Sequence, residues 1–186
     1  MTNDKRETYI SVDIEASGPI PGEYSMIALG ACRVDDPTKT FYAELKPISD
    51  KAIPEALAVS KLDLATLKVN GEEPAIAMMR FDSWLSEVTS GMQPVFVGFN
   101  ATFDWAFVNW YFIKYAGKNP FGIGGIDIKA FYMGFAGVTW DKTRSSQLSA
   151  EFHTESKDKH NALADAVSQA ATFQKILAAS RARAKR

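Results

Sequence analysis

Four acidic residues embedded in apolar or alanine-rich sequence constrain this chain more than any other feature. They lie in three separate segments, at Asp13 and Glu15, at Asp104, and at Asp165. A carboxylate buried without a compensating cation is too costly to persist in a folded protein. The chain must therefore either expose these acids on its surface or gather them around cations, and we favour a pair of divalent metal ions.

The chain has the size and apolar content of one domain. With 186 residues, 46% of them hydrophobic, it can bury one sizeable core. It contains no run of 18 apolar residues and no apolar segment near its polar N-terminus, so no membrane span and no signal peptide are expected. Cys32 is the only cysteine, which excludes an internal disulfide and favours a reducing, cytoplasmic location.

Charge is nearly balanced, with 21 Lys and Arg against 22 Asp and Glu. This balance excludes a strongly basic protein that coats nucleic acid through charge alone. If phosphates bind to the chain, metal ions must supply much of the positive charge. We interpret residues 1–7 as a frayed or disordered N-terminus, and residues 179–186 as a basic tail at a frayed helix end.

The order of predicted elements indicates an α/β fold. Three segments rich in β-branched and aromatic residues predict an antiparallel meander, because their connections are too short for a crossover helix: residues 8–14, 25–34 and 40–45. Helices and short buried strands then alternate along the chain: helix 73–88, strand 93–99, helix 103–114, strand 126–128, a helical segment to Phe135, and helix 160–177. The pattern predicts one mixed β-sheet, with an antiparallel meander plus parallel strands, flanked by helices.

Helical spacing also predicts which side chains face the core. In the first long helix they are Ile76, Met79, Phe81, Leu85 and Val88. In the second they are Phe103, Phe107, Trp110 and Tyr111. In the last they are Leu163, Val167, Ala170, Phe173 and Leu177. We interpret Gly30, inside a predicted strand, as a point of close packing.

Asp13 and Glu15 lie two residues apart in a predicted strand, so their side chains share one face of the sheet. An exposed sheet face with ordinary surface acids is the alternative interpretation. Small residues follow at once, Ala16-Ser17-Gly18, and would let a ligand approach the backbone closely. Asp104 falls in the first turn of a predicted helix that Asn100 or Thr102 could cap, a position that also suits a purely structural Asp.

His160 precedes Asp165 by five residues, which is about 140° of rotation on an α-helix. The two side chains cannot point the same way from one regular helix, so we place His160 on the loop before the helix and Asp165 on the helix itself. An imidazole beside a bound water suits general-base work, although an exposed loop histidine without function is the alternative. His153 is interpreted as a residue without a catalytic role.

Three motifs in order resemble those of a known family. The three motifs of this chain are Asp13-Ile14-Glu15-Ala16-Ser17-Gly18, Asn100-Ala101-Thr102-Phe103-Asp104 and His160-Asn161-Ala162-Leu163-Ala164-Asp165. They are similar to the motifs of the DnaQ-like DEDDh 3′–5′ exonucleases, which have an RNase H-like fold. The resemblance covers residues 8–178 as a single domain. A related subfamily has tyrosine four residues before the last Asp, where this chain has Asn161, so His160 selects the histidine subfamily.

The resemblance implies a metal-dependent enzyme that releases nucleoside 5′-monophosphates from the 3′ end of single-stranded DNA or RNA. It implies a catalytic set that holds two Mg²⁺ or Mn²⁺ ions through Asp13, Glu15, Asp104 and Asp165, with His160 as the base that deprotonates the attacking water. It further implies substrate contacts from Ala16, Ser17, Gly18, Met26, Ile27, Asn100 and Phe103, with Met26 or Ile27 wedged against the last base. Core packing is the alternative for Ile27.

Departures from the family pattern leave the substrate open. Phe99 stands where many relatives have His, Ala28 where many have an acid, and Asn161 where many have a basic residue; Ser17 replaces a common Thr. DNA or RNA preference, substrate length and physiological role are not determined by the sequence. A non-catalytic nucleic-acid-binding module, or a phosphodiesterase of very short oligonucleotides, are the alternative functions. A homodimer is left open, and no polymerase partner is identified.

Overall fold

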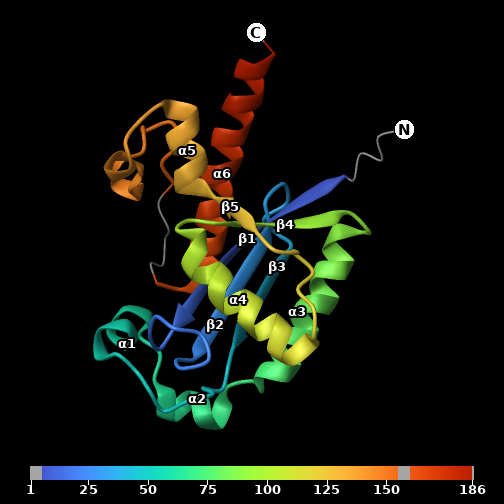
Figure 1. Ribbon diagram of the computed structural model, residues 1–186, viewed down its shortest axis with the longest axis vertical. Coiled ribbons are helices and arrows are strands. Elements are labelled where there is room, and N and C mark those ends of the chain that lie inside the picture. The colour runs from blue at the N-terminus through green and yellow to red at the C-terminus, as the bar shows by residue number, and fades with distance from the viewer. Residues whose placement is uncertain (1–5, 155–159, 186) are drawn as a thin grey trace.

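A five-stranded mixed sheet forms the centre of the molecule (Figure 1). The computed structural model describes residues 6–154 and 160–185. The strands are β1 (Glu7–Ala16), β2 (Met26–Arg33), β3 (Thr40–Glu44), β4 (Gln93–Gly98) and β5 (Gly125–Asp127). Their order is β3-β2-β1-β4-β5, with β1, β2 and β3 antiparallel and β1, β4 and β5 parallel. The predicted meander with added parallel strands is confirmed.

Six α-helices and two short 3₁₀ helices surround the sheet in the described part of the chain. They are α1 (Pro54–Ser60), α2 (Leu64–Asn70), α3 (Pro74–Thr89), α4 (Ala101–Ala116), α5 (Ile128–Ala136), η1 (Trp140–Thr143), η2 (Ser145–Gln147) and α6 (Ala162–Ala184). The four predicted helices are present, whereas α1 and α2 were not predicted.

Both ends of the chain depart from the predicted boundaries. Helix α6 continues to Ala184, so the prediction of a frayed tail from residue 179 was wrong for this part of the chain. The side chain of Arg183 explains part of the extension, because its Nη1 donates a hydrogen bond to the Phe135 carbonyl at the end of α5 (3.0 Å). At the other end, β1 begins at Glu7. The prediction for residues 1–5 lies outside the described residues.

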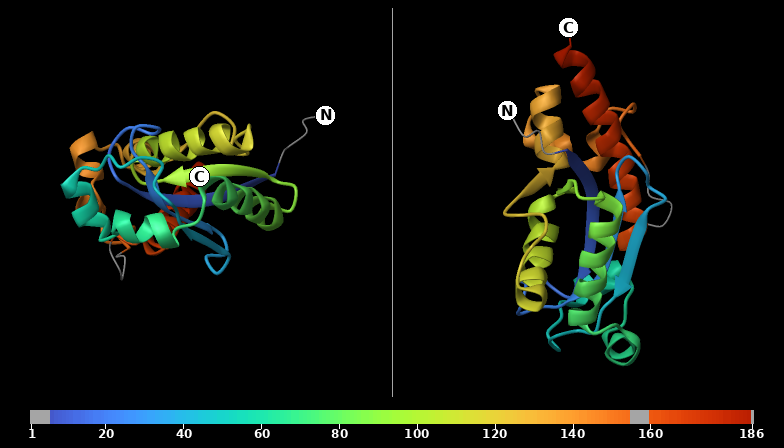
Figure 2. Two further views of the ribbon diagram at one scale, coloured as in Figure 1. Left: turned by 90° about the horizontal axis from the view of Figure 1, so that it is seen from below. Right: turned by 90° about the vertical axis from the view of Figure 1, so that its right-hand side faces the viewer.

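Helices cover both faces of the sheet, and the alternation of side chains along β1 determines which residues meet which layer. Val12 and Ile14 point to the face covered by α3 and α4, where they join one buried core. Tyr9 packs in a second core, which α5 and α6 complete on the opposite face. Figure 2 shows these layers on either side of β1. Asp13 and Glu15 alternate with the first set, so they face α6.

Small residues let α6 pack directly against the middle of the sheet. Gly30 on β2 lies opposite Asp13 on β1. A Cβ atom at Gly30 would lie 2.3 Å from the backbone carbon of Ala162, so the first turn of α6 rests on this glycine. The face of α6 against the sheet is built from alanines four residues apart: Ala162, Ala166 and Ala170. The close packing predicted for Gly30 is present. Because Gly30 lies opposite Asp13, this packing places the first turn of α6, which contains Asp165, close to Asp13.

The buried helix faces agree with the predicted ones only in part. The residues buried as predicted are Phe81, Leu85 and Val88 on α3, Phe107 and Tyr111 on α4, and Ala170 and Phe173 on α6. In α3, Ile76 and Met79 are 48% and 60% exposed, and Ala77 and Met78 are buried instead. In α4, Phe103 is 41% exposed and is not a core residue. In α6, the predicted face residues Leu163, Val167 and Leu177 are only half-buried. Apolar spacing gives most weight to large side chains, whereas these helices approach the sheet partly through small ones.

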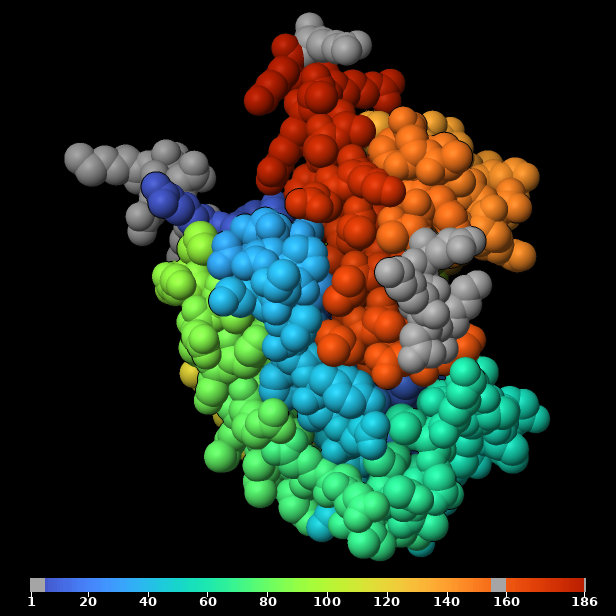
Figure 3. All heavy atoms as spheres, turned by 180° about the vertical axis from the view of Figure 1, so that it is seen from behind, coloured from blue at the N-terminus to red at the C-terminus, as the bar shows by residue number. Residues whose placement is uncertain are grey.

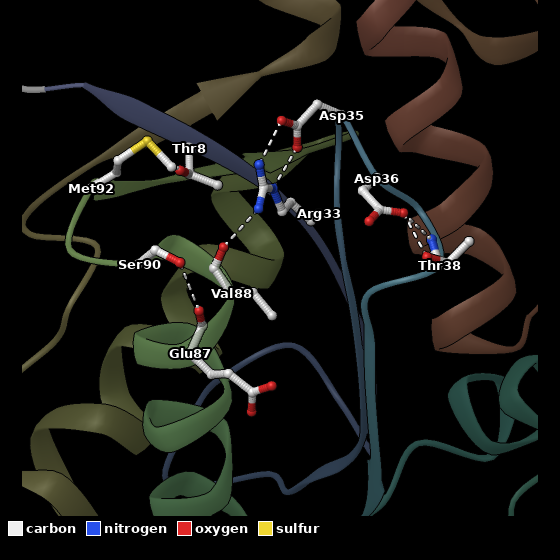
Figure 4. A network of polar contacts seen from close by, with 9 residues as sticks. All are labelled: Thr8, Arg33, Asp35, Asp36, Thr38, Glu87, Val88, Ser90 and Met92. Carbon is white, nitrogen blue, oxygen red and sulfur yellow. Dashed lines mark hydrogen bonds and ion pairs between the residues drawn. The ribbon is translucent and has the colours of Figure 1, made fainter.

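Arg33, at the end of β2, ties the sheet to the end of α3 (Figure 4). Its Nη1 donates to the Val88 carbonyl at 3.0 Å, which satisfies one of the acceptors that a helix leaves free in its last turn. Its Nε and Nη2 bind both carboxylate oxygens of Asp35 at 2.6 and 2.8 Å. This paired contact holds the guanidinium in place, since planar two-point geometry restricts its rotation.

Across the described parts of the chain, no helix has both the length and the apolar content that crossing a bilayer requires.

Candidate metal centre

Three of the four predicted acids converge where β1 meets the start of α6. Asp13 and Glu15 project from β1 toward the helix, and Asp165 lies in its first turn. One carboxylate oxygen from each of the three lies within 4.8 Å of the other two. Segments separated by about 150 residues in the chain therefore contribute to one acidic cluster, which we call the three-acid cluster.

Asp104 lies next to this cluster but does not complete it among the described residues. It is only 5% exposed, in the first turn of α4, and its Oδ1 accepts a hydrogen bond from the Ile14 backbone nitrogen at 3.0 Å. Strand β4 pairs with β1 only as far as Ser11. Beyond that point, Asp104 accepts the hydrogen bond from the backbone nitrogen of Ile14 on β1. Its role as a metal ligand stays a prediction, and its backbone contact is an observed structural role.

Burial and neighbouring negative charges raise the pKa values of Asp13, Glu15 and Asp104. Burial is the main cause for Asp13, whose pKa lies well above the usual range, and the neighbouring charges of Asp104 and Asp165 raise it further. Burial followed by repulsion from Asp165 raises the pKa of Glu15 to about 7. Burial likewise raises the pKa of Asp104 to about 7, against the opposing effect of the Ile14 hydrogen bond. Without a cation, burial and neighbouring charges therefore oppose the ionisation of Asp13, Glu15 and Asp104.

The residues present fit a hard divalent cation. The three-acid cluster offers carboxylate oxygens only, which are the ligands that Mg²⁺ and Mn²⁺ prefer. Its members repel one another when ionised, and a bound dication would offset that repulsion. The raised pKa values and the spacing of the oxygens thus have a common explanation in a divalent metal site.

His160 lies on the loop before α6, as its spacing from Asp165 predicted. The helix begins after its N-cap residue Asn161, whose side chain accepts a hydrogen bond from the Ala164 nitrogen at 3.0 Å. His160 has a left-handed backbone (φ 66°), and its own backbone nitrogen donates to Oδ2 of Asp165 at 2.9 Å. The histidine is exposed, so its ring can exchange protons with solvent.

A pocket of about 460 Å³ opens beside the acids, within the size range of small-molecule sites. Asp13, Asp165 and His160 line it together with Asn100 and His153. His153 was predicted to have no catalytic role; its Nδ1 lies 3.0 Å from the carbonyl oxygen of Ser145, which also lines the pocket. From behind, a small dark-blue area reaches the surface between the orange-red start of α6 and the teal segment that contains α1 (Figure 3).

Two of the predicted substrate contacts are excluded by burial. Met26 and Ile27 are both 0% exposed, so neither side chain can wedge against a nucleotide base as predicted. Their side chains point to opposite faces of β2, and both are packed inside the protein. Core packing, the alternative given for Ile27, is the observed role.

The loop after β1 is fixed by its own small residues. Ser17 is fully buried, and its hydroxyl donates to the Lys51 carbonyl and accepts from the Ser25 nitrogen, both at 2.9 Å. Gly18 packs beneath an aromatic ring, because a Cβ there would lie 2.2 Å from Cδ1 of Tyr24. Ala16 is 7% exposed. The Ser17 hydroxyl is therefore used inside the protein, and its backbone nitrogen and carbonyl are also hydrogen-bonded, to the Ser25 carbonyl and the Ile53 nitrogen, both at 2.8 Å.

Asn100 and Phe103, the remaining predicted substrate contacts, are exposed beside the acids. Asn100 occupies the N-cap position of α4, but its side chain makes no capping hydrogen bond; Oδ2 of Asp127 accepts from the Ala101 nitrogen at 2.7 Å instead. The Asn100 Oδ1 accepts from Nζ of Lys129 at 2.7 Å. An amide held by its oxygen presents its NH₂ group as a donor, which suits a phosphate or carbonyl acceptor.

Sequence comparison agrees with this site. The RNase T family model, described as an exonuclease, matches residues 10–173, which include all four acids and His160. The chain belongs to this exonuclease family. It is a DnaQ-like 3′–5′ exonuclease of the DEDDh type, as the resemblance implied.

Relatives of this exonuclease support the same assignment. The 3′-5′ DNA exonuclease Cap18 of Escherichia coli is 48% identical over 177 residues, which cover 95% of this chain and 94% of that protein. The nuclease domain of 3′hExo, a DEDDh family member solved with rAMP, superposes with a TM-score of 0.74 at 12% identity, covering 96% and 95% of the two chains. E. coli Exonuclease I, solved with a dT13 oligonucleotide, superposes with a TM-score of 0.72 at 18% identity. The match covers 97% of this chain and 43% of that protein. At these identities the two structures support the fold.

Two residues of the exonuclease site were not predicted from its sequence. Gln169 lines the pocket one helical turn after Asp165, so the spacing of four residues on α6 was a signal that could have found it. Lys129 is 9% exposed, with its ammonium 4.1 Å from the centre of the Trp140 ring. No sequence signal pointed to Lys129, because its link to the site runs through a tertiary contact with Asn100.

Proposed function

We propose that this exonuclease hydrolyses single-stranded DNA from its 3′ end, using two Mg²⁺ or Mn²⁺ ions, and releases nucleoside 5′-monophosphates. The observation that carries the proposal is the three-acid cluster at the edge of a pocket that also contains His160. DNA is the substrate in the name of the E. coli relative that is 48% identical. RNA remains an outcome of the test, because contacts with the 2′-hydroxyl decide between the two substrates.

We assign the metal ligands to Asp13, Glu15 and Asp165, with Asp104 as the fourth acid. When bound, the divalent ions supply positive charge for the developing charge on the phosphate and increase the acidity of water. The acids themselves bring no net charge to the substrate, because their negative charges are matched by the metal. Such a site can accept a phosphodiester in a chain whose formal net charge is −1.

His160 is proposed as the general base. Its ring takes a proton from the attacking water and returns it to solvent, since the side chain is exposed at the pocket. The hydrogen bond from its backbone nitrogen to Asp165 fixes the loop relative to the three-acid cluster. A neutral imidazole is required for this step.

Substrate contacts are proposed for the residues that remain accessible. Phe103 presents an exposed ring that can stack on a base, and it is supported from below by Phe107, whose ring centre lies 5.2 Å away. Asn100 offers an amide donor, and the predicted contacts Ala16, Ser17 and Gly18 directly follow Glu15 in the chain. These contacts concern the terminal nucleotide and do not require a long basic track.

The test is digestion of matched DNA and RNA oligonucleotides, labelled at the 5′ end, in the presence of Mg²⁺ or Mn²⁺. We expect stepwise shortening from the 3′ end of single-stranded DNA and nucleoside 5′-monophosphate as product. Asp13→Asn and His160→Ala should remove most activity, while Glu87→Gln, an exposed acid on α3, should not. Full activity of Asp13→Asn would refute the metal assignment.

The same assay separates the alternatives. Cleavage confined to dinucleotides and trinucleotides would identify a phosphodiesterase of very short oligonucleotides. Binding of oligonucleotides without any product, at every metal tested, would identify a non-catalytic binding module. Faster digestion of RNA than of the matched DNA would replace the proposed substrate and leave the metal site unchanged.

A further inference from the structure

We propose that Gln169 is a positioning residue that holds Asp13 in its metal-binding orientation through a hydrogen bond to Oδ1. The proposal rests on the function proposed above for the three-acid cluster. It extends that function to a neutral side chain that belongs to none of the three motifs.

Gln169 connects three segments that meet at the site. It lies on α6 one turn after Asp165, so both side chains project toward the end of β1. Its Nε2 donates to Oδ1 of Asp13 at 2.5 Å. Its Oε1 accepts from the Phe99 backbone nitrogen at 2.9 Å, directly after β4 ends at Gly98. One amide thus links α6 and β4 to the acid on β1.

The Phe99 contact determines which end of the amide faces Asp13. A backbone N–H can only donate, so it must meet the amide oxygen of Gln169. The NH₂ group, which can only donate, is then left to meet the carboxylate. A donor fixed on one carboxylate oxygen restricts rotation of the Asp13 side chain about its last bond. The carboxylate therefore keeps one orientation before a cation arrives.

A neutral donor suits this position better than a charged one. Burial and three neighbouring acids all oppose ionisation of Asp13, and the Gln169 hydrogen bond is the interaction that favours its charged form. A lysine would place a competing positive charge in the cation site, and a glutamate would add a fourth repelling charge. Groups that orient a metal ligand in this way typically change metal affinity by about 10- to 100-fold when removed.

The test compares Gln169→Met with wild type and with Gln174→Met, an exposed glutamine of the same helix. Methionine keeps an unbranched side chain of similar length and removes both hydrogen bonds. Mn²⁺ is titrated calorimetrically into each metal-free protein. We expect Gln169→Met to bind Mn²⁺ about 10- to 100-fold more weakly, with Gln174→Met equal to wild type. We also expect saturating Mn²⁺ to restore kcat of Gln169→Met, with KM for the oligonucleotide unchanged.

Each outcome has a distinct meaning. Equal Mn²⁺ affinity in Gln169→Met and wild type overturns the role of Gln169 and leaves the metal site in place. Absence of Mn²⁺ binding in wild type overturns the proposed function itself. If Gln169→Met shows no cooperative melting, Gln169→Asn replaces it, because the shorter amide stays polar but cannot span both partners. Wild-type affinity in Gln169→Asn then overturns the proposal.

Discussion

The metal-free exonuclease should lose stability as pH rises, because its acid cluster resists ionisation. Burial and repulsion raise the pKa of Glu15 from 4.5 to about 7. Between these values the Glu15 side chain of the unfolded chain releases a proton that the folded protein retains, so the contribution of Glu15 to the free energy of unfolding falls with rising pH and levels off above about pH 7. The difference between these two pKa values corresponds to about 3 kcal/mol, and partial exposure of Glu15 to solvent reduces this to about 2 kcal/mol.

Thermal melting in the presence of a chelator, at about pH 5 and about pH 8, measures this loss directly. For a chain of this length, about 2 kcal/mol lowers the melting temperature by about 4–8 °C. Excess Mg²⁺ at the higher pH should restore most of it, since a ligand of the folded state alone stabilises that state. Glu15→Gln should flatten the pH dependence, while Glu87→Gln should keep it. The reasoning is refuted if Glu15→Gln loses as much stability as wild type over this range.

Three other substitutions test separate parts of the site. Gly30→Ala should lower the melting temperature by about 2–10 °C and weaken Mn²⁺ binding, because its Cβ would meet the first turn of α6; unchanged melting and calorimetry would contradict this packing. Asp104→Asn keeps an oxygen that can accept the hydrogen bond from the Ile14 nitrogen, so without metal the variant should melt at the same or a higher temperature than wild type. Its kcat should nevertheless fall by at least about 100-fold. Activity near that of wild type would exclude Asp104 from the metal site. Lys129→Met releases Asn100, so KM for the oligonucleotide should rise by about tenfold with little change in kcat, and an unchanged KM would exclude this contact.

The sequence was sufficient for the sheet and for the location of the acids. The strand pattern predicted the meander, and the spacing of His160 and Asp165 predicted a loop histidine before a helix. Gly30 was identified as a packing point from its position in a strand. These features depend on local propensity, and on motifs whose residues lie within a few positions of one another, so a single sequence contains them.

Other features could not be obtained from the sequence, because they depend on contacts between distant segments. Met26 was expected to touch substrate, yet whether an apolar strand residue faces a pocket or a core depends on the helices that cover it. Asn100 or Thr102 was expected to cap α4, but the Oδ2 atom of Asp127 accepts the hydrogen bond from the Ala101 nitrogen at that helix end instead. Gln169 and Lys129 belong to no motif. The role of Gln169 depends on contacts such as the one with Phe99, 70 residues away in the chain, and the role of Lys129 depends on its contact with Asn100, 29 residues away. Tertiary packing decides such cases.

The most direct measurement is a crystal structure of the protein grown with Mn²⁺, with the metal located by its anomalous scattering. We predict a peak bound by carboxylate oxygens of Asp13, Glu15 and Asp165, with His160 on the adjacent loop and Gln169 still donating to Asp13. Manganese bound elsewhere on the molecule, with the oxygens of these three acids left without a metal, would contradict the assignment of the catalytic site.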